Sequence, residues 1–232
     1  MQKPFLFDID GTLVSGVNDS ALSTILAEDR FTQAISRGLG LSVRHKKDFR
    51  GLTDYLILKI LLEDEGWATE QIESAMPELI KELDKVHERT FRAADIKLLP
   101  GVKQLLIALR QHGIALGLIT GNLQPVARRK LEALGVWPYF SVGGFGDDPH
   151  TVRADLVRLA IKRAGFEDRK EDVYVIGDTP RDIEAAHQAG VHNSVGVANG
   201  YRDIQELKGA GAKVVFEDFK DTKLVLKKLA IG

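Results

Sequence analysis

The sequence predicts an α/β fold in which a parallel sheet is covered by helices and interrupted by one helical insertion. From Pro100 onward, short apolar runs typical of strands alternate with helical patterns. Another apolar run, Phe5-Leu6-Phe7, stands near the start of the chain, and residues from about 19 to 94 carry helical patterns alone. Because regular strand-helix alternation is typical of a parallel sheet with both faces covered, we expect the insertion to form a second, smaller domain.

The insertion follows a loop expected at Ser15-Gly16-Val17-Asn18 and contains three helical patterns. In each pattern, apolar residues recur three and four positions apart, which is the spacing of one helix face. They are Ala21, Leu22, Ile25 and Leu26; Tyr55, Leu58, Leu61 and Leu62; and Ile72, Met76, Leu79, Ile80 and Leu83. We therefore place an all-helical domain at residues 16–95 and the sheet domain at residues 1–15 and 96–232.

The second part of the chain alternates regularly. A helix from Val102 to about His112 should stop at Gly113, since glycine commonly ends helices. We expect further helices between the strands that apolar runs predict at residues 114–119, 173–176, 194–198 and 213–216. The glycine-rich segment 143–146 is expected to be irregular.

The composition excludes several functions. The chain has 232 residues, 44% of them hydrophobic and 28% charged, as in an ordinary globular protein. A net charge of -1 argues against nucleic-acid binding, and the lack of cysteine excludes disulfides, a thiol nucleophile and thiolate metal sites. We find no 18-residue apolar span and no signal-peptide pattern, so we expect no membrane partner and a cytoplasmic location. The choice between monomer and dimer stays open.

Two carboxylates follow the first predicted strand. Asp8 and Asp10 are two residues apart, so in an extended chain their side chains point the same way. The carboxyl edge of an open parallel sheet faces the ligand crevice, so we expect both there, with a cation to compensate their charge. A polar strand end followed by a turn at Gly11 and Thr12 would explain the same residues.

Anion-binding groups are expected at the same edge. Thr120, Gly121 and Asn122 follow the strand at 114–119 and offer a hydroxyl and free backbone N–H groups. A glycine also lets an oxyanion approach the backbone closely. The alternative is a glycine turn with a local threonine hydrogen bond.

Arg153 is a second anion-binding candidate. It shares the apolar face of its helix, because Leu156, Val157 and Ala160 lie three, four and seven residues after it. Such an arginine either extends to water or reaches a buried anion, and we favour the anion.

A second acidic segment follows the strand at 173–176. Thr179 can cap the next helix, and Asp182 can complete a capping box. This local account leaves Asp178 unexplained at the end of a strand. With Asp8 and Asp10, Asp178 supplies the hard oxygen ligands that Mg²⁺ prefers, so the sequence predicts a magnesium and phosphate site.

These motifs, in this order, resemble those of the haloacid dehalogenase superfamily of phosphohydrolases, over about residues 4–200. Asp8-Ile9-Asp10-Gly11-Thr12 resembles the first motif, Thr120 the second, Arg153 the third, which is commonly lysine, and 177–182 the acidic fourth. The resemblance implies a Rossmann-like core with residues 16–95 as a helical cap. The chain is most similar to the phosphoglycolate-phosphatase-like members.

The resemblance also implies a mechanism. Asp8 would attack phosphorus and form an aspartyl-phosphate, while Asp10 would protonate the leaving alcohol and later activate water. For that role Asp10 should begin protonated, which the charge of the neighbouring Asp8 favours by raising the Asp10 pKa. Carbon–halogen cleavage needs no such proton donor, so Asp10 favours phosphate transfer over dehalogenation.

The implied ligands follow from the same resemblance. Mg²⁺ would be bound by Asp8, the Asp10 backbone carbonyl and Asp178, with Asp182 holding the metal's waters or Arg153. The phosphoryl group would be bound by Thr120, Gly121, Asn122 and Arg153.

The segment Gly51-Leu52-Thr53-Asp54 resembles the part of the cap that touches the substrate in related phosphatases. Arg50, Gly51 and Thr53 are therefore candidate substrate contacts. The basic stretch that ends at Arg50 is either a solvated helix end or a contact with a second anionic group of the substrate. The histidines, His87 among them, are expected at the surface or in packing.

The expected reaction is hydrolysis of a small phosphomonoester, such as phosphoglycolate or a sugar or nucleotide monophosphate. One alternative is a phosphotransferase such as a hexose-phosphate mutase, which passes the same phosphoryl group to a sugar hydroxyl. Another is a catalytically silent phosphate-binding or signalling module, against which the intact acid at Asp10 argues.

Overall fold

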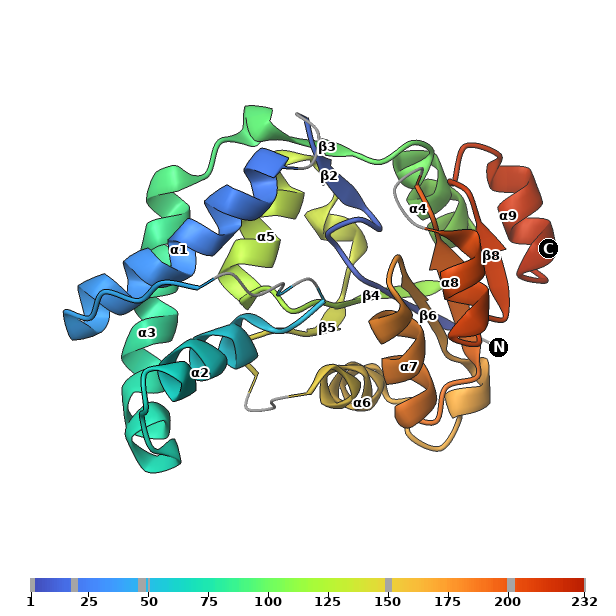
Figure 1. The fold of residues 1–232 in the computed structure, drawn as a ribbon. Coiled ribbons are helices and arrows are strands. Elements are labelled where there is room, and N and C mark those ends of the chain that lie inside the picture. Colours follow the sequence, from blue (N-terminus) through green and yellow to red (C-terminus); the bar gives the residue numbers. More distant parts are fainter. Residues whose placement is uncertain are drawn as a thin grey trace.

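The computed structural model describes residues 3–17, 21–45, 49, 51–148, 152–199 and 203–231. Its centre is a six-stranded sheet of order β5-β4-β1-β6-β7-β8, parallel throughout, with helices on both faces (Figure 1). The strands are β1 (Pro4–Phe7), β4 (Ala115–Ile119), β5 (Val142–Gly144), β6 (Tyr174–Gly177), β7 (Asn193–Val197) and β8 (Val214–Phe216). The expected α/β class with a Rossmann-like core is confirmed.

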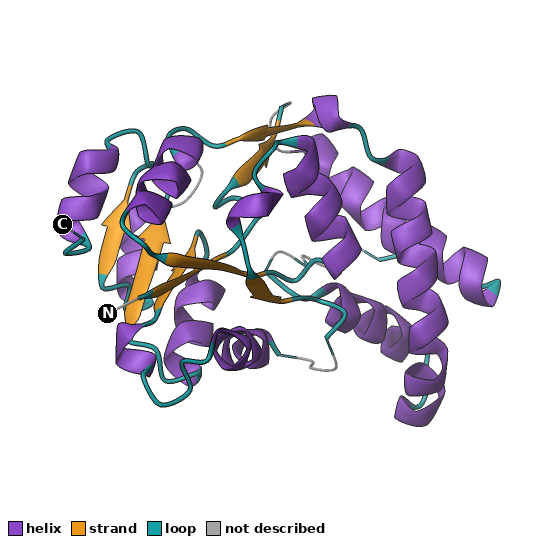
Figure 2. Cartoon of the chain, turned by 180° about the vertical axis from the view of Figure 1, so that it is seen from behind, coloured by secondary structure: helices purple, strands orange, loops and turns teal. Residues whose placement is uncertain are grey.

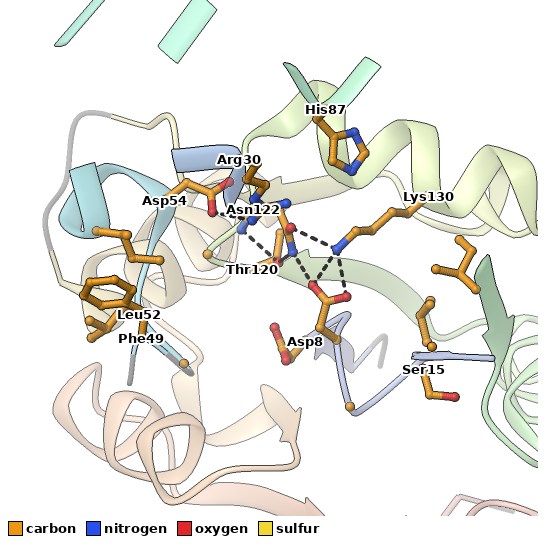
Figure 3. Close-up of a pocket in the computed structure, with 18 of the residues that line it drawn as sticks. Asp8, Ser15, Arg30, Phe49, Leu52, Asp54, His87, Thr120, Asn122 and Lys130 are labelled. Carbon is orange, nitrogen blue, oxygen red and sulfur yellow. Dashed lines mark hydrogen bonds and ion pairs between the residues drawn. The ribbon is translucent and has the colours of Figure 1, made fainter. Parts of the chain in front are cut away.

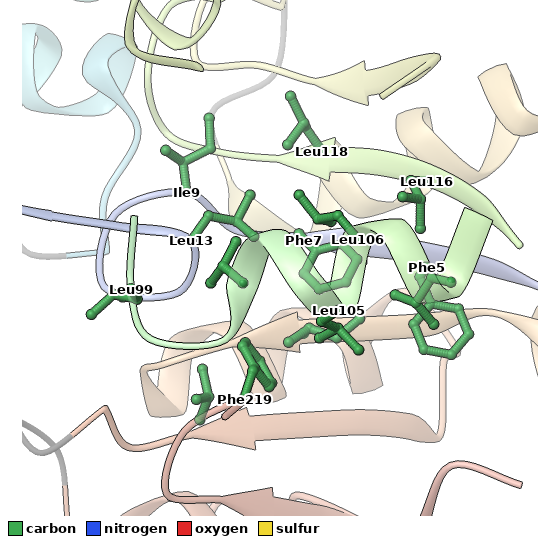
Figure 4. Close-up of a cluster of buried hydrophobic side chains, with 14 of the residues drawn as sticks. Phe5, Phe7, Ile9, Leu13, Leu99, Leu105, Leu106, Leu116, Leu118 and Phe219 are labelled. Carbon is green, nitrogen blue, oxygen red and sulfur yellow. The ribbon is translucent and has the colours of Figure 1, made fainter. Parts of the chain in front are cut away.

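Two layers of helices bury the two faces of this sheet, as Figure 2 shows from behind. Successive side chains of a strand point to opposite faces, so Phe5 and Phe7 enter one cluster and Leu6 the other. The face of Phe5 and Phe7 packs against α4 (Val102–Gln111), α5 (Gln124–Ala133) and α9 (Thr222–Lys228), and Figure 4 shows this cluster. The other face packs against α6 (Arg153–Ala164) and α7 (Pro180–Gln188), with α8 (Ile204–Gly209) beside α7.

The insertion is helical, as the periodicity predicts. It contains α1 (Ala21–Leu39), α2 (Asp54–Asp64) and α3 (Thr69–Thr90). These helices share their own apolar cluster, which Leu123 and Val126 at the start of α5 also join. The helical unit therefore packs on the sheet domain through α5, close to the carboxyl edge of the sheet.

Three short strands were missed by the sequence analysis. The loop expected after β1 contains β2 (Val14–Gly16), which pairs antiparallel with β3 (Ile96–Leu98) at the far end of the insertion. The segment expected to be irregular contains the edge strand β5. Strands of only three residues carry little periodicity, and partners distant in the sequence stabilise them. In the described part of the chain, no helix combines the length and apolarity needed to cross a membrane.

Candidate active site

Two neighbouring strands bring carboxylates together at the carboxyl edge of the sheet. Asp8 follows β1 and Asp178 follows β6, and the Asp8 N–H donates to the Ile176 carbonyl at 2.9 Å. With Asp182, in the first turn of α7, they form a buried cluster in which one carboxylate oxygen from each lies within 4.8 Å of the others. Gly11 (φ +85°) makes room for it, since a Cβ there would lie 2.3 Å from Asp178 Oδ2.

Asp182 has two roles in the structure. Its Oδ2 accepts from the Thr179 N–H at 2.9 Å and from the Thr179 hydroxyl at 2.7 Å, so the predicted capping box exists. Its Oδ1 lies 2.5 Å from Arg153 Nη2, which also lies 2.6 Å from Asp8 Oδ1. Of the two roles considered for Arg153, contact with buried anions is therefore the one observed, and these anions are carboxylates.

The carboxylates of the cluster repel one another. Burial raises the pKa of Asp8 well above its ordinary value of 3.8; Arg153 opposes this effect, while Asp182 and Asp178 add to it. Asp8 and Asp182 share the guanidinium of Arg153, and a divalent cation among the carboxylates would relieve both desolvation and mutual repulsion.

The Asp10 carboxylate lies outside this cluster, beside a lysine that the sequence analysis did not single out. Lys130 Nζ lies 2.8 Å from each Asp10 oxygen, and Asn122 Nδ2 donates to Asp10 Oδ2 at 2.6 Å. Lys130 also donates to Asn122 Oδ1 at 3.1 Å (Figure 3). These contacts fix the Asp10 carboxylate, although 52% of its side chain is exposed to the cavity.

The pKa of Asp10 is lowered, which corrects the expectation of a raised pKa. Burial alone would raise it, but the Lys130 charge and the hydrogen bonds from Lys130 and Asn122 outweigh burial. Repulsion from Asp8 alone would raise the pKa of Asp10, but the compensating cation comes from α5, 120 residues further along the chain.

A signal for Lys130 was present in the sequence. On α5, Lys130 lies four and three residues after Val126 and Ala127 and directly before Leu131, all of them buried. A lysine within an apolar helix face needs an anionic partner, because burying an unpaired charge is costly. The same reasoning that identified Arg153 as a partner of buried anions therefore applies to Lys130.

The loop after β4 lies at the same edge, as predicted. The Thr120 hydroxyl accepts from the Asn122 N–H at 3.2 Å and from Asn122 Nδ2 at 2.8 Å. The local hydrogen bond considered as the alternative therefore exists, and the Asn122 N–H is already engaged. Gly121 has a steric role, since a Cβ there would lie 2.3 Å from the Leu52 carbonyl oxygen of the insertion.

Asp54, at the first position of α2, joins the insertion to this loop. Its Oδ2 accepts from the Leu123 N–H at 3.0 Å, and its Oδ1 lies 3.0 Å from Arg30 Nη2 on α1. Its own N–H donates to the Gly121 carbonyl at 2.7 Å. One buried carboxylate thus connects two helices of the insertion with the loop that carries Thr120 and Asn122.

The three candidate substrate contacts in the insertion have different outcomes. Arg50 lies outside the described residues. Gly51 (φ +76°) lines the cavity beside the first motif, near Thr179 and Arg181. Thr53 is buried, and its hydroxyl accepts from the Leu56 N–H at 3.1 Å as the cap of α2.

A cavity of about 510 Å³ joins these groups between the sheet and the insertion. The acidic cluster and Arg153 line it together with Thr120, Asn122 and Lys130. Figure 3 shows Thr120, Asn122 and Lys130 close to Asp8. Apolar side chains of the insertion form much of the remaining wall: Phe31, Phe49, Leu52, Ile57 and Phe91. The volume is in the range of small-molecule sites.

Comparison with known proteins agrees with this geometry. The sequence profile of the haloacid dehalogenase-like hydrolases matches residues 3–190, so the chain belongs to this family. The expectation of an enzyme of the phosphatase type within it is confirmed as well. A phosphoglycolate phosphatase of Photorhabdus laumondii is 27% identical, over 94% of this chain and 90% of that protein.

Solved structures share the fold over nearly the whole chain. A hydrolase from Pseudomonas syringae superposes with a TM-score of 0.67 at 26% identity, covering 98% of this chain and 99% of the other. A β-phosphoglucomutase from Clostridium difficile reaches a TM-score of 0.71 at 18% identity, covering 99% and 98%.

Proposed function

We propose that this hydrolase is a magnesium-dependent phosphomonoesterase that acts on a small phosphorylated metabolite through an aspartyl-phosphate at Asp8. One observation carries the proposal: Asp8, Asp178 and Asp182 form a buried cluster with carboxylate oxygens within 4.8 Å of one another, at the carboxyl edge of the sheet. Arg153 pairs with Asp8 and Asp182, and the convergence of three carboxylates suits a divalent cation.

The donor set fits Mg²⁺, because every proposed ligand is a hard oxygen atom. Asp8, Asp178 and the Asp10 backbone carbonyl would bind the ion, with Asp182 reaching it through water. When bound, the ion would neutralise the carboxylates and the charge of the phosphoryl group.

The chemistry proceeds in two displacements. The Asp8 carboxylate attacks phosphorus, the bond between phosphorus and the ester oxygen breaks, and Asp10 gives its proton to the departing alkoxide. Water then attacks phosphorus, Asp10 takes a proton from that water, and inorganic phosphate leaves as the Asp8 carboxylate is restored.

Asp10 must hold a proton in the first displacement, although Lys130 lowers its pKa. The phosphate dianion of the substrate opposes Lys130, because a negative charge close to a carboxyl group raises its pKa. Lys130 and Asn122 would meanwhile keep the Asp10 carboxyl oriented towards the cavity.

Four residues are proposed to bind the phosphoryl group: Thr120, Gly121, Asn122 and Arg153. The guanidinium of Arg153 already lies against Asp8, so it would meet the oxygens of any group transferred to that side chain. Fixed donors of this kind stabilise the charge that develops in the transition state.

Residues 16–95 are proposed to act as the cap that selects the substrate, with Arg50, Gly51 and Thr53 as candidate contacts. The relative named phosphoglycolate phosphatase supports a substrate of the phosphoglycolate type. A cavity of about 510 Å³ is also large enough for a sugar or nucleoside monophosphate.

The proposal is tested by phosphate release from a panel of phosphomonoesters with Mg²⁺, using wild type and Asp8→Asn. We expect Asp8→Asn to lose about 10³-fold or more in turnover, because no nucleophile remains. Asp155→Asn is the matched control, since Asp155 pairs with Arg158 on the outer part of α6. Turnover that survives in Asp8→Asn would contradict an intermediate on this residue.

The phosphotransferase alternative uses the same intermediate and is separated by its product. Release of inorganic phosphate from a hexose monophosphate supports hydrolysis, whereas an isomeric hexose phosphate without phosphate release supports a mutase. Absence of turnover on the whole panel would favour the silent module.

A further inference from the structure

His87 is a buried side chain in the cavity that the catalytic proposal does not use. It lies in the last turn of α3, is 6% exposed and lines the cavity. In Figure 3, His87 and Asp8 lie on opposite sides of Asn122 and Lys130. The sequence analysis assigned it to the surface or to packing, because its spacing from other histidines forms no motif.

The contact with Arg129 determines where the imidazole carries its proton. Arg129 Nη1 lies 2.9 Å from His87 Nδ1, and Arg129 is held in place by Asp84, whose Oδ1 lies 3.0 Å from Nη2. A guanidinium can only donate hydrogen bonds, so Nδ1 must accept. A neutral His87 therefore has its proton on Nε2.

The ring is held neutral and in a fixed orientation. Burial lowers the pKa of His87 to about 3, and the charges of Lys130, Arg30 and Arg129 act in the same direction. The ring also stacks on Phe91, with 5.2 Å between centroids and 21° between planes.

The Nε2–H group is a donor without a protein partner among the described residues. The contacts of His87 in the structure are the Arg129 hydrogen bond at Nδ1 and the Phe91 stacking. His87 lines the cavity, so this donor can find its acceptor in a bound ligand or in water.

We propose that the His87 Nε2–H is a specificity-determining donor that binds an oxygen acceptor, a hydroxyl or a carboxylate, on the leaving group of the phosphomonoester. This inference rests on the proposed function and adds the class of leaving group. An acceptor-bearing leaving group satisfies the donor, whereas a hydrocarbon leaving group displaces water and leaves the donor unpaired.

Matched substrates test this inference. Glycerol phosphate and propyl phosphate differ in hydroxyls, and phosphoglycolate and ethyl phosphate differ in the carboxylate, so the two pairs also distinguish the acceptors. The measured quantity is the ratio of kcat/KM within each pair. We expect His87→Phe, which keeps the ring and loses the donor, to lower this ratio about five- to tenfold for at least one pair.

Two further variants control for structural damage. His87→Gln keeps an N–H donor and should hold the ratio within about twofold of wild type. His192→Phe, at an exposed histidine outside the cavity, should not change the ratio.

A ratio in His87→Phe equal to that of wild type for both pairs overturns the inference, while turnover itself leaves the proposed function standing. If wild type hydrolyses other phosphomonoesters of the panel but none of these four, the inference fails and the proposed function stands; absence of turnover on the whole panel ends both.

A second measurement does not depend on activity. Nitrogen-15 NMR of the labelled full chain should show His87 as a neutral ring protonated at Nε2 between pH 5 and pH 8. A ring protonated at Nδ1, or one that titrates within this range, would refute the assignment.

Discussion

Each acidic residue of the first motif has its own cation. Arg153 compensates Asp8 and Lys130 compensates Asp10, and the two cations come from different helices. The pKa values of the two groups shift in opposite directions, because burial outweighs Arg153 at Asp8, whereas Lys130 and Asn122 together outweigh burial at Asp10. Two carboxyl groups two residues apart thereby have different proton affinities, but in the reverse of the order that a nucleophile and a proton donor require. A divalent cation bound at Asp8 would lower the pKa of that carboxyl group, and the substrate dianion would raise the pKa of Asp10.

We expect Lys130→Met to lower kcat about 10²-fold, because the variant keeps the stem of the side chain but releases the Asp10 carboxylate. Without the cation, the pKa of Asp10 rises, so the basic limb of the pH–rate profile, where Asp10 loses the proton needed in the first displacement, should move to higher pH. Steady-state kinetics across pH measures both effects. Arg128→Met is the control, since Arg128 pairs with Glu132 at the surface. A basic limb at the same pH in Lys130→Met would show that Lys130 does not act on the essential carboxyl group.

At the scale of elements, the start of α2 connects the insertion to the loop after β4. The cap of the helix is Thr53, and the next residue, Asp54, accepts from the Leu123 N–H and pairs with Arg30. Burial raises the pKa of Asp54, while Arg30 and the Leu123 hydrogen bond oppose this effect. A buried carboxylate with two partners specifies one orientation of these elements, because any other orientation leaves charges unpaired.

We expect Asp54→Ala to reduce the free energy of unfolding by about 3–5 kcal/mol, because Arg30 would remain as a buried, unpaired charge. Urea unfolding measures the loss, and hydrogen exchange at the Leu123 amide should become faster. Lys59→Ala, which removes an exposed pair with Glu63 on the same helix, should change stability by less than about 0.5 kcal/mol. Unchanged exchange at Leu123 would show that Asp54 does not hold the two parts together.

At the scale of the whole molecule, the sheet and the insertion each have an apolar core, and the polar site lies between them. This arrangement concentrates buried charge at the junction while each core remains apolar. Binding at the junction should therefore change the stability of the whole chain.

We expect Mg²⁺ to raise the free energy of unfolding by about 1.4 kcal/mol when its concentration is ten times its dissociation constant. A chelator should remove both this gain and the turnover. Thermal unfolding with and without Mg²⁺ is the measurement, and Asp178→Asn should abolish the response, because a carboxylate of the cluster is lost. An equal response in Asp178→Asn would locate the ion elsewhere.

Stability should also fall in acid because of His87. Its pKa falls from 6.5 to about 3 on folding, so below pH 6.5 the unfolded chain binds a proton that the folded chain does not. This stabilisation is complete above pH 6.5 and is lost towards pH 3, at up to about 1.4 kcal/mol per pH unit. Urea unfolding between pH 5 and pH 7 should show a smaller slope in His87→Gln; identical slopes would mean that the histidine is not held neutral.

Local patterns in the sequence determined the fold class and the part of the site formed by Asp8, Asp178 and Arg153. The apolar runs before Asp8 and Asp178 identify two strand ends, and parallel strands must present these ends at one edge of a sheet. The periodicity of the insertion predicts α1, α2 and α3 because apolar positions on one helix face are set by local geometry. The same reasoning predicts Arg153 as a site residue, because it is an arginine on the apolar face of its helix.

The tertiary structure alone decided which groups compensate these carboxylates. Lys130 meets Asp10 across 120 residues, and Arg129 meets His87 across 42, so no local pattern records either pairing. The short strands β2 and β3 lie at opposite ends of the insertion, and each forms by pairing with the other. The physical reason is that strand ends and helix faces are set by neighbouring residues, whereas a pKa or a tautomer is set by charges that only the folded chain brings within hydrogen-bonding distance.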